Sequence, residues 1–214
     1  MEFKEILNKR HSSRSFTEKK IDKKDLKEIA LEAQKVPSWG NSQPWKVFIA
    51  TGETLENIRK EYMERGEKGI KGNSDYIPTD TETWHEFLKK HMESFYKKIL
   101  SLPDASMVGG QFQWELFKAP AVAYFAIPKR ATRYSVLDLG TFVQTFILSA
   151  TDKGIDSVHA YQLIKYPDIL RKYMNIPEDF DIVTGVALGY ENDHPVNKIK
   201  SERESIEEVL EIYE

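Results

Sequence analysis

Seven consecutive residues near the N-terminus, Arg10 to Phe16, combine side chains that proteins use to bind phosphate. They read Arg-His-Ser-Ser-Arg-Ser-Phe, which brings together guanidinium, imidazole and hydroxyl groups. Guanidinium groups bind phosphate through paired hydrogen bonds, while hydroxyls and backbone N–H groups satisfy the remaining oxygens. Arg10, His11, Ser12 and Arg14 are therefore candidate ligands of a phosphomonoester. Taken alone, the segment also fits a solvated basic turn, because short basic stretches are common.

A second polar segment, Pro37 to Trp45, reads Pro-Ser-Trp-Gly-Asn-Ser-Gln-Pro-Trp. Ser38 and Asn41 carry donors and acceptors that suit a polar ring edge, and Trp39 offers a flat aromatic face. The alternative is a connection from a helix to a strand, and for Trp45 we expect packing in the core.

Together these segments resemble the nitroreductase family of FMN-dependent oxidoreductases. The first motif, R-x-S-x-R-x-F, is carried by Arg10, Ser12, Arg14 and Phe16, and the second, P-S-x-x-N-x-Q-P-W, by Pro37, Ser38, Asn41, Gln43, Pro44 and Trp45. The resemblance implies an α+β fold with a central, mostly antiparallel sheet flanked by helices, in an intertwined homodimer. It also implies FMN as cofactor, with NADH or NADPH as electron donor.

The resemblance indicates further cofactor-binding residues outside the two motifs. Gln113 lies where family members offer an amide, commonly from Asn, to the flavin pyrimidine edge; a surface Gln without a role is the alternative. Tyr161 takes the position of the backbone N–H donor to flavin N5, and Lys200 and Arg203 match basic residues that complete the phosphate socket. The implied set is Arg10, His11, Ser12, Arg14, Pro37, Ser38, Trp39, Asn41, Gln113, Tyr161, Lys200 and Arg203, with Pro37 to Asn41 supplied by the partner subunit.

The chemistry that the resemblance implies needs no catalytic acid or base, because flavin N5 takes hydride from NAD(P)H. Arg14 and the Tyr161 backbone would assist, and a small electron-poor acceptor such as a nitroaromatic or quinone would react next in a ping-pong mechanism. For His159 we expect a structural role rather than protonation of a substrate. The alternatives are a flavin-binding or flavin-storage protein without significant turnover, and another flavin-dependent reductive enzyme, a dehydrogenase or dehalogenase.

Composition limits the remaining function classes. The 214 residues suit one domain over residues 1–214, and the net charge of −3 disfavours nucleic acid as a partner. The chain has no cysteine, which excludes disulfides and thiolate chemistry. We expect no metal site, because His85 and His91 point to different faces of one helix. No stretch reaches about 20 apolar residues, so we expect no membrane contact and a cytoplasmic location.

Hydrophobic spacing predicts the elements that position these residues. Expected helices cover 2–9, 22–35, 84–100, 135–153 and 168–174, with another starting at Thr54. Expected strands cover 46–50, 121–127 and 181–190, and residues 155–161 are expected to form a strand or a turn. The segment at about 65–110 is interpreted as an insertion that covers the active site, and an ordinary amphipathic helix is the alternative. Helix 135–153 is apolar beyond one stripe, which fits either a subunit interface or a central core helix.

Overall fold

The computed structural model describes residues 1–76, 81–101 and 111–214 and centres on an antiparallel sheet. Four strands form it in the order β1-β2-β4-β3, and each neighbouring pair is antiparallel. Their bounds are β1 Lys46–Thr51, β2 Ala121–Pro128, β3 Asp156–His159 and β4 Phe180–Gly189. The predicted α+β class with a central antiparallel sheet is confirmed.

Strand β2 lies inside the sheet and is buried on both faces. Residues 121–127 of this strand are at most 3% exposed, which explains why its sequence is apolar without polar alternation. Val122, Tyr124 and Ala126 belong to one hydrophobic core cluster, whereas Ala123 and Phe125 belong to the other. Because successive side chains of a strand point to opposite faces, β2 joins two cores.

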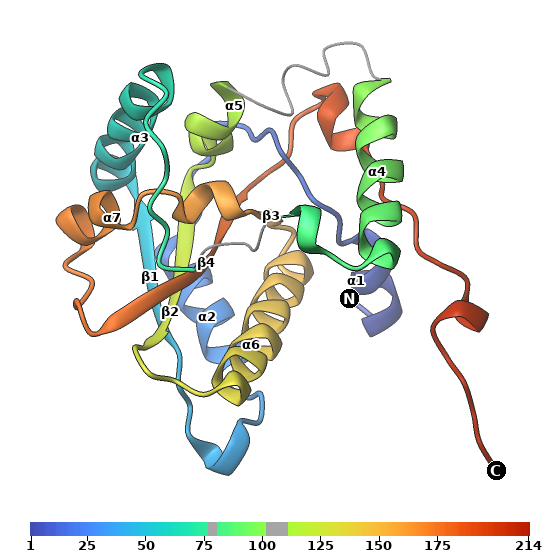
Figure 1. Cartoon of the computed structure of the whole chain (residues 1–214). Helices are drawn as coiled ribbons and strands as arrows, with labels where there is room; N and C mark the ends of the chain where they lie inside the picture. The colour runs from blue at the N-terminus through green and yellow to red at the C-terminus, as the bar shows by residue number, and fades with distance from the viewer. Residues whose placement is uncertain (77–80, 102–110) are drawn as a thin grey trace.

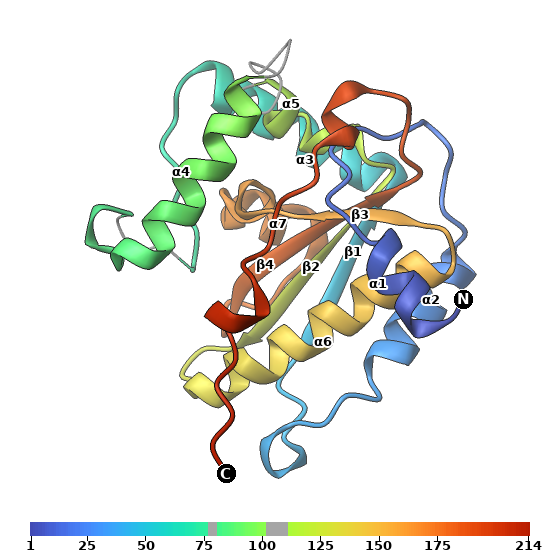
Figure 2. The ribbon, with the colours of Figure 1, turned by 90° about the vertical axis from the view of Figure 1, so that its right-hand side faces the viewer.

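Helices cover both faces of the sheet (Figures 1 and 2). One core contains residues of α2 (Lys23–Ala33) and α6 (Arg133–Asp152), and the other contains residues of α3 (Gly52–Glu67) and α7 (Pro167–Met174). The short helix α5 (Gln111–Trp114) leads towards β2. Trp45 is 9% exposed and its ring centroid lies 4.9 Å from that of Phe142, so the expected core role of Trp45 is confirmed.

Helix α6 combines a core face with an exposed apolar face. Phe142 and Phe146 are buried against the sheet, whereas Tyr134 and Leu137 are 57% and 63% exposed. The Thr132 hydroxyl accepts a hydrogen bond from Ser135 N at the start of the helix. Both sequence interpretations of this helix therefore remain open: one face packs in the core, and the other is available for a subunit interface.

Two predicted helix starts were wrong. Helix α3 begins at Gly52 rather than near Thr54, because Gly52 has a φ of +54° and lets β1 turn directly into the helix. Helix α7 begins at Pro167, a residue whose fixed φ suits the first helical position. Asp168 therefore lies in the first turn rather than at the N-cap position, and its carboxylate binds Arg65.

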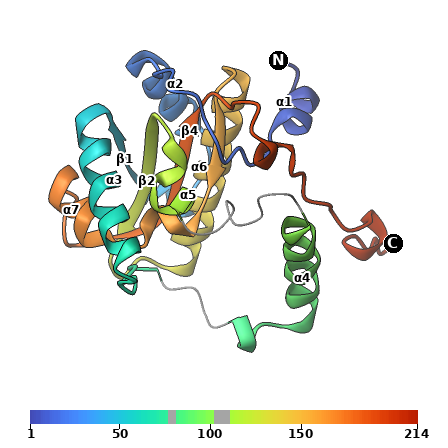
Figure 3. The same cartoon turned by 90° about the horizontal axis from the view of Figure 1, so that it is seen from above.

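Two helices lie outside these layers, α1 (Phe3–Lys9) and α4 (Glu86–Leu100). Figure 3 shows α4 set apart from the sheet, with the C-terminal segment between it and α1. Ile99 of α4 packs against Val196 and Ile199, which follow β4. Parts of the predicted 65–110 insertion, residues 77–80 and 102–110, lie outside the described residues, and α3 occupies its start through Glu67.

Within the described ranges, no helix combines the length and apolarity needed to cross a bilayer.

Candidate functional site

A cavity of about 520 Å³ lies where the N-terminal segment meets the C-terminal segment. Its lining carries four cationic side chains, those of Arg10, Arg14, Lys200 and Arg203. The complete lining is Leu7, Asn8, Arg10, His11, Ser12, Arg14, Phe95, Ile199, Lys200, Ser201 and Arg203. Six of the residues that the sequence singled out for phosphate binding therefore meet in one cavity, although about 190 positions separate Arg10 from Lys200.

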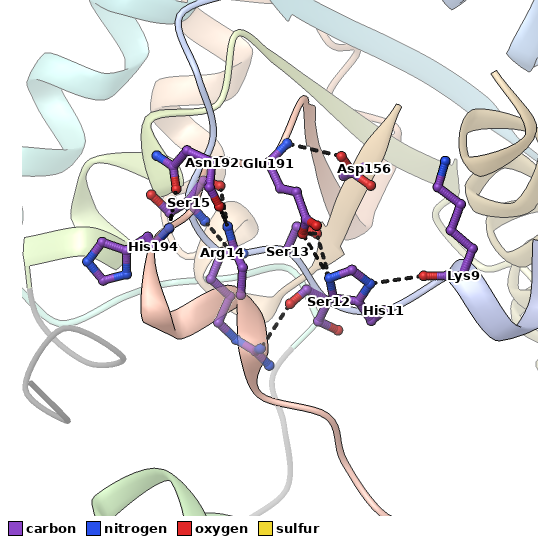
Figure 4. Close-up of polar contacts among 11 residues, drawn as sticks. Lys9, His11, Ser12, Ser13, Arg14, Ser15, Asp156, Glu191, Asn192 and His194 are labelled. Atoms are coloured by element: carbon purple, nitrogen blue, oxygen red, sulfur yellow. Dashed lines mark hydrogen bonds and ion pairs between the residues drawn. The ribbon is translucent and has the colours of Figure 1, made fainter. Parts of the chain in front are cut away.

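The sheet fixes the backbone of the N-terminal segment beside this cavity. Ser13 N donates to Ser157 O at 2.9 Å, so the segment lies along β3. Thr17 N donates to Tyr190 O at 2.8 Å just beyond the end of β4. Figure 4 shows the side chains of this segment beside the two strands, with Lys9, His11, Ser12, Ser13, Arg14 and Ser15 labelled. Strands β3 and β4 thus fix the backbone position of the N-terminal segment, which carries the guanidinium and hydroxyl groups.

Asn197 holds the backbone at Arg14 and Ser15, and sequence reasoning missed it. Its Oδ1 accepts from Arg14 N at 2.7 Å and from Ser15 N at 3.2 Å. Its Nδ2 donates to Ser15 O at 2.8 Å and to Asn192 O at 3.0 Å. Asn197 is 7% exposed and lies in the 3₁₀ turn Pro195–Lys198. No local pattern could reveal this role, because its partners Arg14 and Ser15 are more than 180 positions away.

The side chain of His11 faces a carboxylate beside the cavity. Its Nε2 lies 2.8 Å from Glu191 Oε2, and its Nδ1 lies 2.9 Å from Lys9 O. The Ser13 hydroxyl donates to the same Glu191 oxygen at 2.9 Å, and Glu191 N donates to Asp156 Oδ2 at 3.0 Å (Figure 4). Burial raises the pKa of Asp156, and the hydrogen bond from Glu191 N opposes that rise only in part. Contacts within the chain thus occupy both ring nitrogens of His11.

The Arg14 guanidinium lines the cavity without an acidic partner among the described residues. Its Nη1 donates to Ser12 O at 3.1 Å, and its central carbon lies 5.9 Å from the centroid of the Phe95 ring. Burial lowers the pKa of Arg14 from its ordinary value, although a guanidinium stays charged at neutral pH. This cation is therefore available to an anionic ligand.

Acidic side chains next to Arg203 face helix α4. Glu202 pairs with Lys98 at 2.8 Å, and Glu204 pairs with the His91 ring at 3.1 Å. Arg203 Nη1 donates to the Ser201 hydroxyl at 2.8 Å. These acidic residues would repel an anion if they faced the cavity, and the ion pairs hold them towards α4 instead.

Arg10 and Lys200 complete the cationic lining. Within the part of the chain that the structure describes, neither side chain forms an ion pair or hydrogen bond. Both cations can therefore bind an incoming anion without first breaking an internal contact.

The second motif lies elsewhere in this protomer. Pro37, Ser38, Trp39 and Asn41 do not line the cavity but surround the 3₁₀ turn Trp39–Asn41. Trp39 N donates to Asp138 Oδ2 at 3.1 Å. Trp39 is 64% exposed, and its ring stacks on that of Tyr134 with 5.6 Å between the ring centroids. The loop is thus fixed at the N-terminal half of α6, and within one chain it cannot join the cavity.

Gln113 and Tyr161 also lie outside the cavity lining. Gln113 belongs to α5, and Tyr161, 43% exposed, begins the 3₁₀ turn Tyr161–Ile164 after β3. His159 Nε2 hydrogen-bonds Thr184 Oγ1 of the neighbouring strand β4, which is a structural contact. The described residues contain no group of three or more His, Cys, Asp or Glu side chains arranged to hold a metal ion.

The chain matches a model of the nitroreductase family over residues 7–190. Among curated proteins, a chloronitrobenzene nitroreductase of Comamonas testosteroni is 28% identical over 95% of this chain and 93% of its own length. A nitrobenzene nitroreductase of Ectopseudomonas oleovorans is 26% identical over 95% of this chain and 93% of its own.

Solved structures with the same fold include two proteins called NfnB. The FMN- and NADPH-dependent nitroreductase NfnB of Sphigopyxis sp. strain HMH superimposes with a TM-score of 0.88 at 22% identity, covering 100% of both chains. The FMN-dependent NfnB of Mycobacterium smegmatis, solved in complex with NADPH, gives a TM-score of 0.88 at 20% identity, covering 99% of this chain and 97% of its own.

Proposed function

The chain belongs to the nitroreductase family and is an oxidoreductase, and we propose that it uses FMN to transfer electrons from NADH or NADPH to a nitroaromatic acceptor. One observation carries the proposal: cations from both ends of the chain converge on one cavity. The curated relatives named above are called reductases of nitrobenzene and chloronitrobenzene, and those names favour a nitroaromatic as acceptor.

The hydrogen-bond donors in the cavity lining suit the phosphate group of FMN. Arg10 and Lys200 have no internal partner among the described residues, and the Ser12 hydroxyl lies beside them in the lining. A phosphate dianion would satisfy both cations through charge-assisted hydrogen bonds. When bound, FMN supplies a ring that accepts hydride and passes electrons on.

Other residues of the chain would orient this cofactor and adjust its charge. Arg14 carries a partly buried cation without an acidic partner among the described residues, and it would stabilise negative charge that develops on the cofactor when electrons enter. The Tyr161 N–H is the proposed backbone donor to N5, and Gln113 the proposed amide donor. We propose ping-pong kinetics, because donor and acceptor would use the same space in turn, with quinones as further acceptors.

The proposed active unit is a homodimer. Pro37 to Asn41 lie outside the cavity of their own chain, so a partner subunit would bring this loop to the cofactor. Helix α4 contributes Phe95 to the lining, which supports the interpretation that the 65–110 segment covers the site within a single domain. A cytoplasmic location stays a prediction from the sequence.

The decisive experiment is a visible absorption spectrum of the purified protein, followed by anaerobic addition of NADH or NADPH. We expect flavin bands that bleach with the donor and return when a nitroaromatic is added. Bound FMN that does not respond to either donor would indicate a storage protein. A colourless protein that also fails to take up added FMN would contradict the proposal.

A further inference from the structure

The chain makes a left-handed turn between helix α5 and strand β2. Leu116, Phe117 and Lys118 have φ angles of +51°, +60° and +53°. A residue with a Cβ is strained in this conformation, so three in succession persist only where the surrounding structure holds them. Strain of this kind is concentrated at functional sites of proteins. The contacts that hold the turn therefore indicate what it positions.

Arg59 of helix α3 holds the backbone at both ends of the turn. Its Nε donates to Glu115 O at 2.8 Å, and its Nη2 donates to Ala119 O at 2.7 Å. Its Nη1 binds the Glu56 carboxylate on the same helix, and the Arg59 side chain is only 12% exposed. One planar guanidinium thus joins the chain before the three left-handed residues to the chain after them.

The three residues of the turn differ in their surroundings. Leu116 and Phe117 are 0% and 5% exposed and belong to the core that contains residues of α3 and α7. Lys118 is exposed, and its Nζ lies 3.4 Å from a carboxylate oxygen of Glu115. Glycine at position 118 would therefore relieve a positive φ without removing side-chain contacts in the core.

Helix α5, which carries Gln113, is attached to the same face of α3 (Figures 1 and 2). Trp114 packs so closely on Gly66 of α3 that a Cβ there would overlap its ring. Gly66 and Arg59 are seven positions apart, so they share one face of the helix. Helix α5 also contacts the 3₁₀ turn that begins at Tyr161. The contacts of α3 therefore fix the backbone that carries the Gln113 amide.

We propose that Arg59 is a positioning residue of the active site, which holds the turn Leu116–Lys118 and thereby orients the Gln113 amide towards the flavin. The inference rests on the proposed function, because FMN is the ligand that Gln113 would bind. Arg59 acts through the backbone of residues 115–119 and not by contact with the ligand. When its guanidinium is removed, the turn can relax towards ordinary φ values, which displaces Gln113.

The reduction potential of bound FMN tests this role in the intact holoprotein. Arg59→Gln removes the guanidinium, and Lys60→Gln, at the next position, which is exposed, removes the same charge. An amide donor directed at the reduced ring favours its reduction. We expect Arg59→Gln to lower the equilibrium constant for two-electron reduction roughly tenfold, or about 30 mV, and Lys60→Gln to leave it unchanged. Equal potentials in the two variants would overturn the proposal.

A double-mutant cycle tests whether the effect passes through Gln113. Gln113→Ala removes the amide, so adding Arg59→Gln to that variant should change the potential no further. The same shift in both backgrounds would mean that Arg59 acts on the flavin by another route, which contradicts the proposal.

Glycine at position 118 tests whether the strained turn carries the effect. When Lys118→Gly is added to Arg59→Gln, we expect both the potential and the urea midpoint to recover, because glycine adopts a positive φ at little cost. Lys118→Ala loses the same ion pair but stays strained, so it should restore neither. If glycine and alanine act alike, the turn is not the link between Arg59 and the flavin.

A failure of this inference can be told apart from a failure of the proposed function. Wild-type protein that binds no flavin contradicts the proposed function, and the link from Arg59 to the cofactor fails with it. Urea unfolding of the flavin-free variants then decides whether Arg59 holds the turn, and equal stability of Arg59→Gln and Lys60→Gln would exclude it. If Arg59→Gln does not fold, Arg59→Lys keeps the charge without the fork and should show the same changes in smaller size.

Discussion

At the scale of single residues, the candidate site divides into side chains that bind a ligand and side chains that hold them. Arg10 and Lys200 point their charges into the cavity without internal partners among the described residues. The side chains of Asn197 and Glu191 instead form hydrogen bonds within the protein. Asn197 binds the backbone of Arg14, and Glu191 binds the ring of His11. Substitutions in the two groups should therefore have different consequences.

Arg10→Ala should weaken FMN binding without unfolding the protein. The substitution removes a charge-assisted phosphate contact, which is expected to cost about 1.5–3 kcal/mol, roughly a ten- to 150-fold loss of affinity. Equilibrium titration with FMN measures the loss. Lys60→Ala, which removes an exposed cation from helix α3, is the matched control and should leave affinity unchanged; unchanged affinity in Arg10→Ala would remove Arg10 from the socket.

Asn197→Ala should reduce the stability of the fold and also weaken FMN binding. The variant leaves the N–H groups of Arg14 and Ser15 without their acceptor in a buried position, for which we expect a loss of about 2–4 kcal/mol in the free energy of unfolding. Urea unfolding with and without FMN measures both effects. Asn57→Ala, on helix α3, is the control; equal stability of the two variants would contradict the role given to Asn197.

At the scale of secondary-structure elements, an ion pair connects helices α3 and α7. Arg65, in the last turn of α3, binds both carboxylate oxygens of Asp168 in the first turn of α7. The hydrogen bond from Arg65 lowers the pKa of Asp168 below its ordinary value. A carboxyl group with a lowered pKa in the folded state stabilises that state only while it is ionised.

Asp168→Asn should therefore lower stability at neutral pH but not in acid. The contribution is present above the unfolded-state pKa of about 3.9 and disappears as the pH falls through the lower folded-state value. Because Asp168 is 48% exposed, we expect at most about 1 kcal/mol. Urea midpoints at about pH 7 and about pH 3 measure it. The exposed Asp179→Asn serves as control, and a difference that persists in acid would exclude this origin.

At the scale of the whole molecule, one protomer leaves the proposed site incomplete and an apolar surface exposed. Trp39, Tyr134 and Leu137 are each more than half exposed, and the first two stack on each other. The same surface includes the loop that the proposed dimer would supply to a partner. Burying it between subunits would remove apolar area from water and complete the cofactor site in one step.

Leu137→Asp should shift the protein towards a monomer and reduce its FMN content, because a charge in the proposed interface would lose its hydration. Sedimentation velocity and the ratio of flavin to protein absorbance measure the two effects. Ile70→Asp changes an exposed apolar residue that follows α3, 43% exposed, and should leave both unchanged. A Leu137→Asp protein that stays dimeric with full FMN content would place the interface elsewhere.

The sequence alone determined the local features of this protein. Residue types predicted the phosphate-binding character of Arg10 to Arg14, and hydrophobic spacing predicted β2 and α6 to within a few residues. Such features depend on interactions between residues close together in the sequence. Hydrophobic periodicity and motif spacing reveal these interactions. The helix starts at Gly52 and Pro167 were not predicted, because neither depends on a capping side chain. The positive φ of Gly52 sets one start, and the fixed φ of Pro167 sets the other.

Only the tertiary structure decided which of these residues meet. It brought Lys200 and Arg203 to the cavity of Arg10, kept Pro37 to Asn41 away from it, and assigned Asn197 to the Arg14 backbone. These relations follow from strand pairing and from hydrogen bonds between residues more than 100 positions apart. No local pattern encodes such partners, because these polar groups lie close together only in the folded chain.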